Sequence, residues 1–185
     1  MRCAVDVAPV RAAPADDAEQ VTQLIRGEPV RVAGRDGDWT WIVTVYDYPG
    51  WVRSAELDDG EGALPPPEGR EPLDVARSYV GAPYLWGGMT EAGIDCSGLV
   101  HMAYRRAGRI VPRDAWQQLD AGTPVGEPEP GDLVLYGDPG KAADHVAFWL
   151  GEGRILHATG RDALGVVDED EPDSLRSRRV AVVRL

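Results

Sequence analysis

A proline-rich stretch divides the chain and constrains its fold more than any other feature. Residues 61–72, EGALPPPEGREP, contain three consecutive prolines. Such a run favours extended polyproline geometry and excludes helix, because proline lacks an N–H group and fixes φ. We therefore place a linker at residues 61–71 and expect two domains, residues 1–60 and residues 72–185.

The segment before the linker has the pattern of a small all-β domain. Its strand-like runs are rich in β-branched and aromatic residues: VTQLI, PVRVAG, WTWIVTV and GWVRS. Gly27, Arg35–Asp38 and Pro49–Gly50 separate these runs, and Asp-Gly in such a place favours a hairpin. Five or so short strands predict a small barrel. The segment has no histidine, so we expect it to bind or shape a substrate rather than to catalyse.

The segment after the linker predicts an α+β domain, in which helices precede an antiparallel sheet. Pro72 suits a first helical position and Gly108 suits a helix stop. Apolar spacing predicts helices over residues 72–80, 97–108 and 112–121, followed by strands over residues 132–136, 145–150, 154–158 and 179–185.

Charge and hydropathy exclude several classes of protein. The net charge is −12 and no basic patch is present, so nucleic acid is not an expected partner. We interpret the acidic run 168–171 as a solvated loop and the basic cluster 176–179 as a solvated strand edge. No apolar run reaches the ~20 residues of a membrane span. The first residues lack a signal-type apolar block, which predicts a cytoplasmic protein.

The two cysteines, Cys3 and Cys96, form no disulfide framework and no zinc-type cluster, so we expect no metal or cofactor. Cys96 lies where a loop becomes a helix, in the stretch IDCSGL. Unpaired N–H groups and the helix dipole at that place favour a thiolate and an oxyanion. Asp95 and Ser97 are also typical helix caps, and a small buried thiol remains the alternative to a nucleophile.

A cysteine nucleophile needs a base, and the chain has three histidines. His101 lies about 140° around the helix from Cys96, so we interpret it as a surface residue. His145 and His157 lie on neighbouring strands joined by a short turn. If Leu150 pairs with Arg154, the two imidazoles are diagonal neighbours on one face.

That pattern assigns three roles by the logic of cysteine hydrolases. Cys96 is the nucleophile, and His145 is the general base and then the general acid. His157 holds the tautomer of His145 and stabilises its charged form. Surface placement of the two histidines is the alternative.

The chain resembles the NlpC-type cell-wall cysteine peptidases, which have a reduced papain-like fold. Six elements occur in the family's order: PYLWGG, DCSGL, VPRDAWQQ, PGDLVLYG, DHVAFWLGEG and ILHATG. The family's cysteine, histidine and third polar residue fall on Cys96, His145 and His157. The segment before the linker resembles the bacterial SH3-like domain that often precedes this peptidase domain.

The stretch DYPGWVRSAEL is similar to a subgroup that cleaves murein tripeptides and tetrapeptides between γ-D-glutamate and the diamino acid. In that subgroup the SH3-like domain selects peptides with a free N-terminal L-alanine. The resemblance implies that Tyr48 contributes to this selection and that Asp95 and Ser97 grip the amine and nearby backbone. It also implies that Tyr84 and Trp86 line the cleft, where core packing is their alternative.

The sequence therefore predicts a monomeric cysteine endopeptidase that recycles murein peptides carrying meso-diaminopimelate or L-lysine. Three alternatives remain at this point. One is a secreted hydrolase of intact peptidoglycan, another is an inert module that binds wall peptides, and the third is an acyltransferase using the same thioester.

Overall fold

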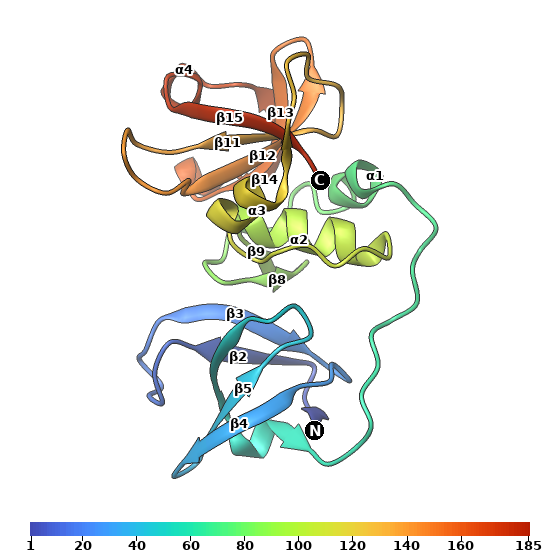
Figure 1. Cartoon of the computed structure of the whole chain (residues 1–185), viewed down its shortest axis with the longest axis vertical. Helices are drawn as coiled ribbons and strands as arrows, with labels where there is room; N and C mark the ends of the chain where they lie inside the picture. Colours follow the sequence, from blue (N-terminus) through green and yellow to red (C-terminus); the bar gives the residue numbers. More distant parts are fainter. The chain divides into compact units, whose positions relative to one another are not determined.

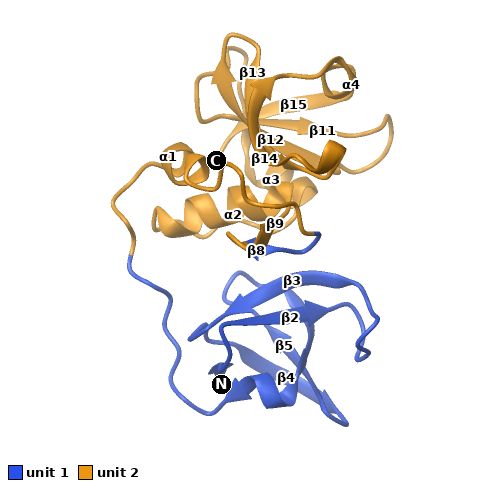
Figure 2. Ribbon diagram, turned by 180° about the vertical axis from the view of Figure 1, so that it is seen from behind, with its two compact units in different colours: residues 1–66, 86–89 blue, residues 67–85, 90–185 orange.

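The computed structural model describes residues 1–185, which form two compact units. Unit 1 contains residues 1–66 and 86–89, and unit 2 contains residues 67–85 and 90–185 (Figure 2). The division falls inside the proline-rich linker, between Pro66 and Pro67. The two units are not separated at one point of the sequence alone, because the short segment 86–89 belongs to the N-terminal unit.

Unit 1 is an SH3-like all-β domain around a five-stranded antiparallel sheet in the order β3-β2-β6-β5-β4 (Figure 1). Its elements are β1 (Arg2–Cys3), β2 (Val7–Arg11), β3 (Gln20–Ile25), β4 (Arg31–Asp36), β5 (Trp39–Val43), β6 (Pro49–Arg53), the 3-10 turn η1 (Ser54–Glu56) and β7 (Leu57–Asp58). The core gathers alternate apolar residues of several strands, among them Val10, Leu24, Ile42 and Val52, all fully buried.

Turn chemistry explains the hairpins of unit 1. The predicted Asp-Gly turn joins β4 to β5, with Gly37 at φ +53°. Pro49–Gly50, expected to break a strand, instead begins β6, and the turn lies just before it with Asp47 at φ +58°. Gly50 is needed inside the sheet because a Cβ there would lie 2.4 Å from the side chain of Val10.

Unit 2 has the predicted α+β organisation, with helices on an antiparallel six-stranded sheet in the order β10-β15-β11-β12-β13-β14 (Figure 1). Its first elements are α1 (Pro72–Arg77), β8 (Met89–Thr90, whose first residue belongs to unit 1), β9 (Gly93–Ile94), α2 (Cys96–Arg106) and α3 (Ala115–Ala121). The sheet and its connections follow: β10 (Thr123–Pro124), β11 (Leu133–Tyr136), β12 (His145–Gly151), β13 (Arg154–Thr159), η2 (Arg161–Ala163), β14 (Gly165–Asp170), α4 (Asp173–Arg176) and β15 (Arg179–Arg184).

The central helix α2 packs on strands β12 and β13. Every residue of this helix except Arg106 is buried, and the ring of Tyr104 stacks on Phe148 with centroids 6.3 Å apart. Gly108, at φ +94°, follows the end of the helix as expected. The opposite face of the sheet has its own apolar cluster around Val134, Ala147 and Ile155.

The β12–β13 hairpin has a bulge that the sequence did not reveal. Gly151, rather than Leu150, pairs with Arg154 at the tip. Past the bulge, Phe148 pairs with Leu156, which is the register we expected for the body of the hairpin. The extra residue is therefore absorbed at the tip, and the two histidines share one face of the sheet.

Several elements were not predicted, among them strand β14 and helix α4. The acidic run 168–171, interpreted as a solvated loop, lies largely in strand β14, whose pairing with β13 extends from Thr159–Gly165 to Arg154–Asp170. The short helix α4 then precedes β15. Acidic residues are depleted in strands, so the local composition predicted a loop. In the structure, backbone pairing with β13 makes the segment a strand instead.

Candidate active site

The predicted nucleophile, Cys96, is the first residue of α2. The N-cap is Asp95, whose side chain accepts a hydrogen bond from the backbone N–H of Gly98 at 2.6 Å, so the predicted cap is confirmed. The thiol is buried, and the backbone N–H of Val146 hydrogen-bonds to its sulfur. Because Val146 follows His145, the start of the helix and the start of β12 meet at this sulfur.

Burial raises the pKa of the Cys96 thiol to about 12, and the neighbouring Asp95 carboxylate acts in the same direction. The N–H groups of Val146 and Ser97 and the Arg113 cation lower it, but they do not offset the burial. The expectation that the helix start by itself produces a thiolate is therefore wrong, because removing a sulfur anion from water costs more than the dipole returns. Proton removal needs a base.

The predicted base and its partner are in direct contact. His145 Nε2 and His157 Nδ1 are 2.7 Å apart, and the rings are nearly perpendicular, at 83°. His157 is buried, whereas His145 is partly accessible. Burial lowers the pKa of His145 to about 3, with smaller contributions from His157 and Arg178, so the resting imidazole is neutral.

Two residues that sequence reasoning missed continue this row. His157 Nε2 lies 2.9 Å from Glu169 Oε1 on the neighbouring strand β14. One guanidinium nitrogen of Arg161, Nη2, donates to both carboxylate oxygens of Glu169 at 2.6 Å. The residues follow one another as His145, His157, Glu169 and Arg161, and we call this set the imidazole row. Glu169 could have been predicted only if residues 165–170 had been identified as a strand that pairs with the strand carrying His157.

Asp95 and Ser97, predicted to bind substrate, belong to a buried network with Arg113. The Arg113 guanidinium donates to both Asp95 oxygens, Nη1 to Oδ1 at 3.0 Å and Nη2 to Oδ2 at 2.8 Å. It also donates to Ser97 Oγ at 2.9 Å. Arg113 is 1% exposed, and we call these three residues the buried triad. An ammonium ligand would have to compete with Arg113, and the binding role of Asp95 and Ser97 stays a prediction.

Tyr84 lies close to the nucleophile. Burial raises the pKa of its phenol, and the charges of Cys96 and Asp95 contribute in the same direction. The turn before it is held against β14, because Val166 N–H donates to the Ala82 carbonyl at 2.8 Å. Gly165, at φ +68°, permits this approach, since a Cβ there would lie 2.1 Å from the same oxygen.

Trp86 and Tyr48 belong to unit 1. The Trp86 indole is 57% exposed and donates from Nε1 to Glu19 Oε1 at 2.9 Å, so core packing does not explain it. Its carbonyl accepts from Gln20 Nε2 at 2.8 Å. Tyr48, half-buried after the β5–β6 turn, lies beside Tyr46 with ring centroids 6.2 Å apart. Contact of either with substrate stays a prediction.

His101 is not the surface residue that helix geometry suggested. It is fully buried, and its Nδ1 lies 2.8 Å from the carbonyl oxygen of Val111. Burial lowers its pKa to about 3, with Arg113 and Arg105 contributing in the same direction. The angle around α2 was correct, but the chain after the helix folds back and covers the side facing away from Cys96.

The charged segments 168–171 and 176–179 are solvated as expected at Asp168, Asp170, Arg176 and Arg179, which are exposed, but not at Glu171. Glu171 is 2% exposed and accepts hydrogen bonds from Arg176, Arg179 and the Tyr136 hydroxyl. Arg178 donates to Asp138 and Asp144. The basic cluster is therefore a set of ion pairs that join α4 and β15 to the sheet.

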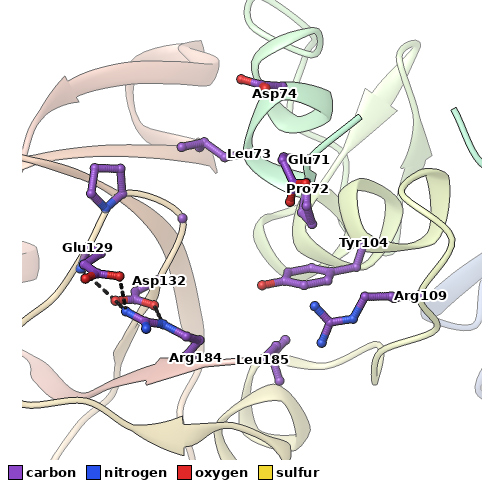
Figure 3. Close-up of a pocket in the computed structure, with 12 residues that line it drawn as sticks. Glu71, Pro72, Leu73, Asp74, Tyr104, Arg109, Glu129, Asp132, Arg184 and Leu185 are labelled. Atoms are coloured by element: carbon purple, nitrogen blue, oxygen red, sulfur yellow. Dashed lines mark hydrogen bonds and ion pairs between the residues drawn. The ribbon is translucent and has the colours of Figure 1, made fainter. Parts of the chain in front are cut away.

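A polar cavity of about 330 Å³ lies elsewhere in unit 2, between the start of α1 and the end of β15 (Figure 3). Tyr104, Arg109 and Arg184 are among its lining residues, and the Arg109 guanidinium lies 5.0 Å from the Tyr104 ring. It contains none of the predicted site residues.

The structure has no helix that is long and apolar enough to cross a bilayer.

Comparison with known proteins identifies the class. The NlpC/P60 family profile matches residues 81–180, so the chain belongs to the NlpC/P60 family of peptidoglycan endopeptidases. The bacterial dipeptidyl-peptidase Sh3 domain profile matches residues 10–57. The fold and family predicted from the sequence are thus confirmed.

Individual proteins similar to this chain support the same family assignment. The chain is 33% identical over 117 residues to a gamma-D-glutamyl-L-lysine dipeptidyl-peptidase of Bacillus cereus, covering 58% of this chain and 34% of that protein. It is 39% identical over 90 residues to the protein of the same name in Bacillus subtilis, covering 46% and 30%. The crystal structure of an NlpC/P60 family protein from Bacillus cereus has a TM-score of 0.59 at 19% identity, covering 99% of this chain and 62% of that one. The chain thus spans about a third of the curated relatives' length.

Proposed function

We propose that this protein is a cysteine endopeptidase that hydrolyses the bond between γ-D-glutamate and a diamino acid in murein peptides. The observation that carries the proposal is a buried thiol at a helix start, hydrogen-bonded to the backbone of the residue that follows a paired histidine in the sequence. Val146, which hydrogen-bonds to the Cys96 sulfur, is adjacent to His145, which contacts His157. The names of the two Bacillus relatives support the choice of bond.

The pKa shifts of Cys96 and His145 support one order of proton movements. In the resting site the Cys96 thiol and the His145 imidazole are both neutral. His145 therefore takes the thiol proton as the sulfur attacks the γ-glutamyl carbonyl, and N–H groups at the start of α2 stabilise the oxyanion. The imidazolium then protonates the leaving amine of the diamino acid. Water hydrolyses the thioester and regenerates the thiol.

We further propose that the substrate carries a free N-terminal L-alanine and that the protein recycles such peptides in the cytoplasm. The profile match of unit 1 to a dipeptidyl-peptidase SH3 domain supports this specificity. In intact wall the alanine is amide-linked to the sugar. An enzyme that requires the free amine therefore acts on released peptides. Diaminopimelate and lysine both remain acceptable as the diamino acid.

A digest tests the function. The protein is incubated with L-Ala-γ-D-Glu-diaminopimelate or its N-acetylated twin, alongside Cys96→Ala and a Cys3→Ala control, and products are followed by mass spectrometry. Cys3 is buried in the core of unit 1, outside the set of residues proposed to act in the reaction. We expect cleavage of the free peptide alone, abolished by Cys96→Ala and retained by Cys3→Ala.

Other results favour the alternatives. Equal cleavage of both peptides contradicts the requirement for a free amine and favours hydrolysis of intact wall. Binding without cleavage favours an inert module. A product in which an added amine has replaced the diamino acid favours acyl transfer.

A further inference from the structure

We propose that Glu169, held by Arg161, is a positioning residue that determines which nitrogen of His145 acts as the base. The inference rests on the proposed function, since it concerns the same histidine. It begins from the far end of the imidazole row. Arg161 Nη2 contacts both Glu169 oxygens at 2.6 Å, and burial, which alone would raise the pKa of Glu169, is outweighed by the hydrogen bonds from Arg161 and His157. Glu169 is therefore a carboxylate, which only accepts hydrogen bonds.

The carboxylate fixes the proton on His157. Because Glu169 Oε1 lies 2.9 Å from His157 Nε2, this nitrogen must donate. His157 is buried, which disfavours a second proton on the ring. Its Nδ1 is therefore a lone pair that accepts a hydrogen bond.

The protonation of His157 in turn fixes the tautomer of His145. An accepting His157 Nδ1 at 2.7 Å requires that His145 Nε2 carries a proton. In a neutral imidazole the remaining nitrogen, Nδ1, is then the lone pair available as a base. Two hydrogen bonds thus carry the preference of one carboxylate to the nitrogen that receives the thiol proton.

The opposite arrangement is disfavoured at a single place. If His145 Nε2 accepted from His157 Nδ1–H, a neutral His157 would present a lone pair to the Glu169 carboxylate. Two acceptors 2.9 Å apart repel each other unless Glu169 takes a proton, and the Arg161 cation opposes that protonation. Arg161 therefore acts on the base, His145, through two intervening side chains, Glu169 and His157.

The strand geometry explains why Glu169 is available for this task. In the β13–β14 register Glu169 pairs with Ile155, so its side chain lies on the face that carries His157, one diagonal away. Its sequence neighbour Asp168 pairs with Leu156 on the other face and forms an ion pair with Arg154 at 2.5 Å. Asp168 thus provides a matched control: an acid on the same strand, paired to an arginine, outside the row.

The test compares Glu169→Gln, Glu169→Ala and Asp168→Asn in the full chain. Ring ¹⁵N spectra report which nitrogens of His145 and His157 are protonated, and digestion of L-Ala-γ-D-Glu-diaminopimelate gives kcat and KM. In the wild type we expect both Nε2 atoms to be protonated and both Nδ1 atoms to be bare. A glutamine amide can donate or accept, so Glu169→Gln should populate both tautomers.

We expect the Glu169 variants to lose about 10- to 100-fold in kcat, as for other residues that orient a functional histidine, with KM nearly unchanged. Asp168→Asn should match the wild type in both readouts. Arg161→Gln leaves Glu169 in place and should shift tautomers and kcat in the same direction by less. It keeps the proposal testable should either Glu169 variant fail to fold.

Three results would overturn the proposal: a wild-type His157 whose protonated nitrogen is Nδ1, tautomers that do not respond to loss of Glu169, or a tautomer shift without a fall in kcat. Failure of the wild type to cleave the peptide would instead contradict the proposed function. The ring spectra and the rate at which iodoacetamide alkylates Cys96 would then still decide the role of Glu169.

Discussion

Two of the polar networks in unit 2 differ in their access to solvent. The buried triad of Asp95, Ser97 and Arg113 is sealed, with each residue at most 7% exposed. The imidazole row is buried at His157 but ends at the half-exposed Arg161. Both contain a carboxylate paired with an arginine, yet only one has a titratable ring at its end.

The difference separates a structural from a functional use of the same ion pair. In the buried triad, Asp95 caps α2 while Arg113 ties the loop before α3 to that cap, so the pair fixes the start of the helix that carries Cys96. In the imidazole row, the pair fixes a hydrogen-bond direction. We expect loss of the first to reduce stability and loss of the second to reduce activity.

The largest expected effect is on the buried triad. Arg113→Met should lower the free energy of unfolding by about 3–5 kcal/mol, because it leaves the Asp95 carboxylate buried without its cation. Urea denaturation measures the change. The double variant Asp95→Leu/Arg113→Met should recover much of the loss, since it removes both charges. A single variant within 1 kcal/mol of wild type would show that the pair does not hold the helix start.

The pH dependence of stability probes the same sealed region. His101, buried beside Arg113, has its pKa lowered to about 3, whereas an unfolded histidine titrates near 6.5. The unfolded chain therefore binds more protons in this window. The stability that neutral His101 contributes is complete above pH ~6.5 and is lost toward pH ~3, by up to ~1.4 kcal/mol per pH unit.

Urea titrations between pH 7 and pH 5 measure this slope. His101→Gln should reduce it by the share of one proton, while the slope due to His145, whose pKa is also lowered to about 3, remains. An unchanged slope in the variant would contradict a neutral buried His101.

The smallest effect on stability is expected in the imidazole row. Glu169→Gln should change the free energy of unfolding by less than about 1 kcal/mol, because its ion pair with Arg161 is partly exposed and screened. Thermal and urea unfolding of the variant and of Asp168→Asn provide the comparison. If Glu169→Gln lowered the free energy of unfolding as much as Arg113→Met, the two networks would contribute equally to stability. The contrast between a structural and a functional ion pair would then be wrong.

Local sequence patterns predicted the structure correctly where the feature depends on a single helix, strand or linker. The three prolines placed the division of the chain, and apolar spacing around Cys96 predicted a helix that starts within one residue of its observed position. The two histidines were expected on one face from strand alternation alone, and the hairpin beyond its bulge has the expected register. Periodicity suffices here because each element repeats its own geometry along the sequence.

The sequence by itself determined the family, and it predicted a two-part organisation and a cysteine–histidine set. Only the tertiary structure decided the environment of each group. It determined the protonated thiol of Cys96 and the burial of His101. It also paired Asp95 with Arg113 and His157 with Glu169. Desolvation and pairing depend on chain segments distant in sequence, and they decide the charge of a buried group more strongly than its immediate neighbours do. The acidic run shows this most clearly, since its composition predicted solvation and its place beside β13 turned one carboxylate toward the histidines.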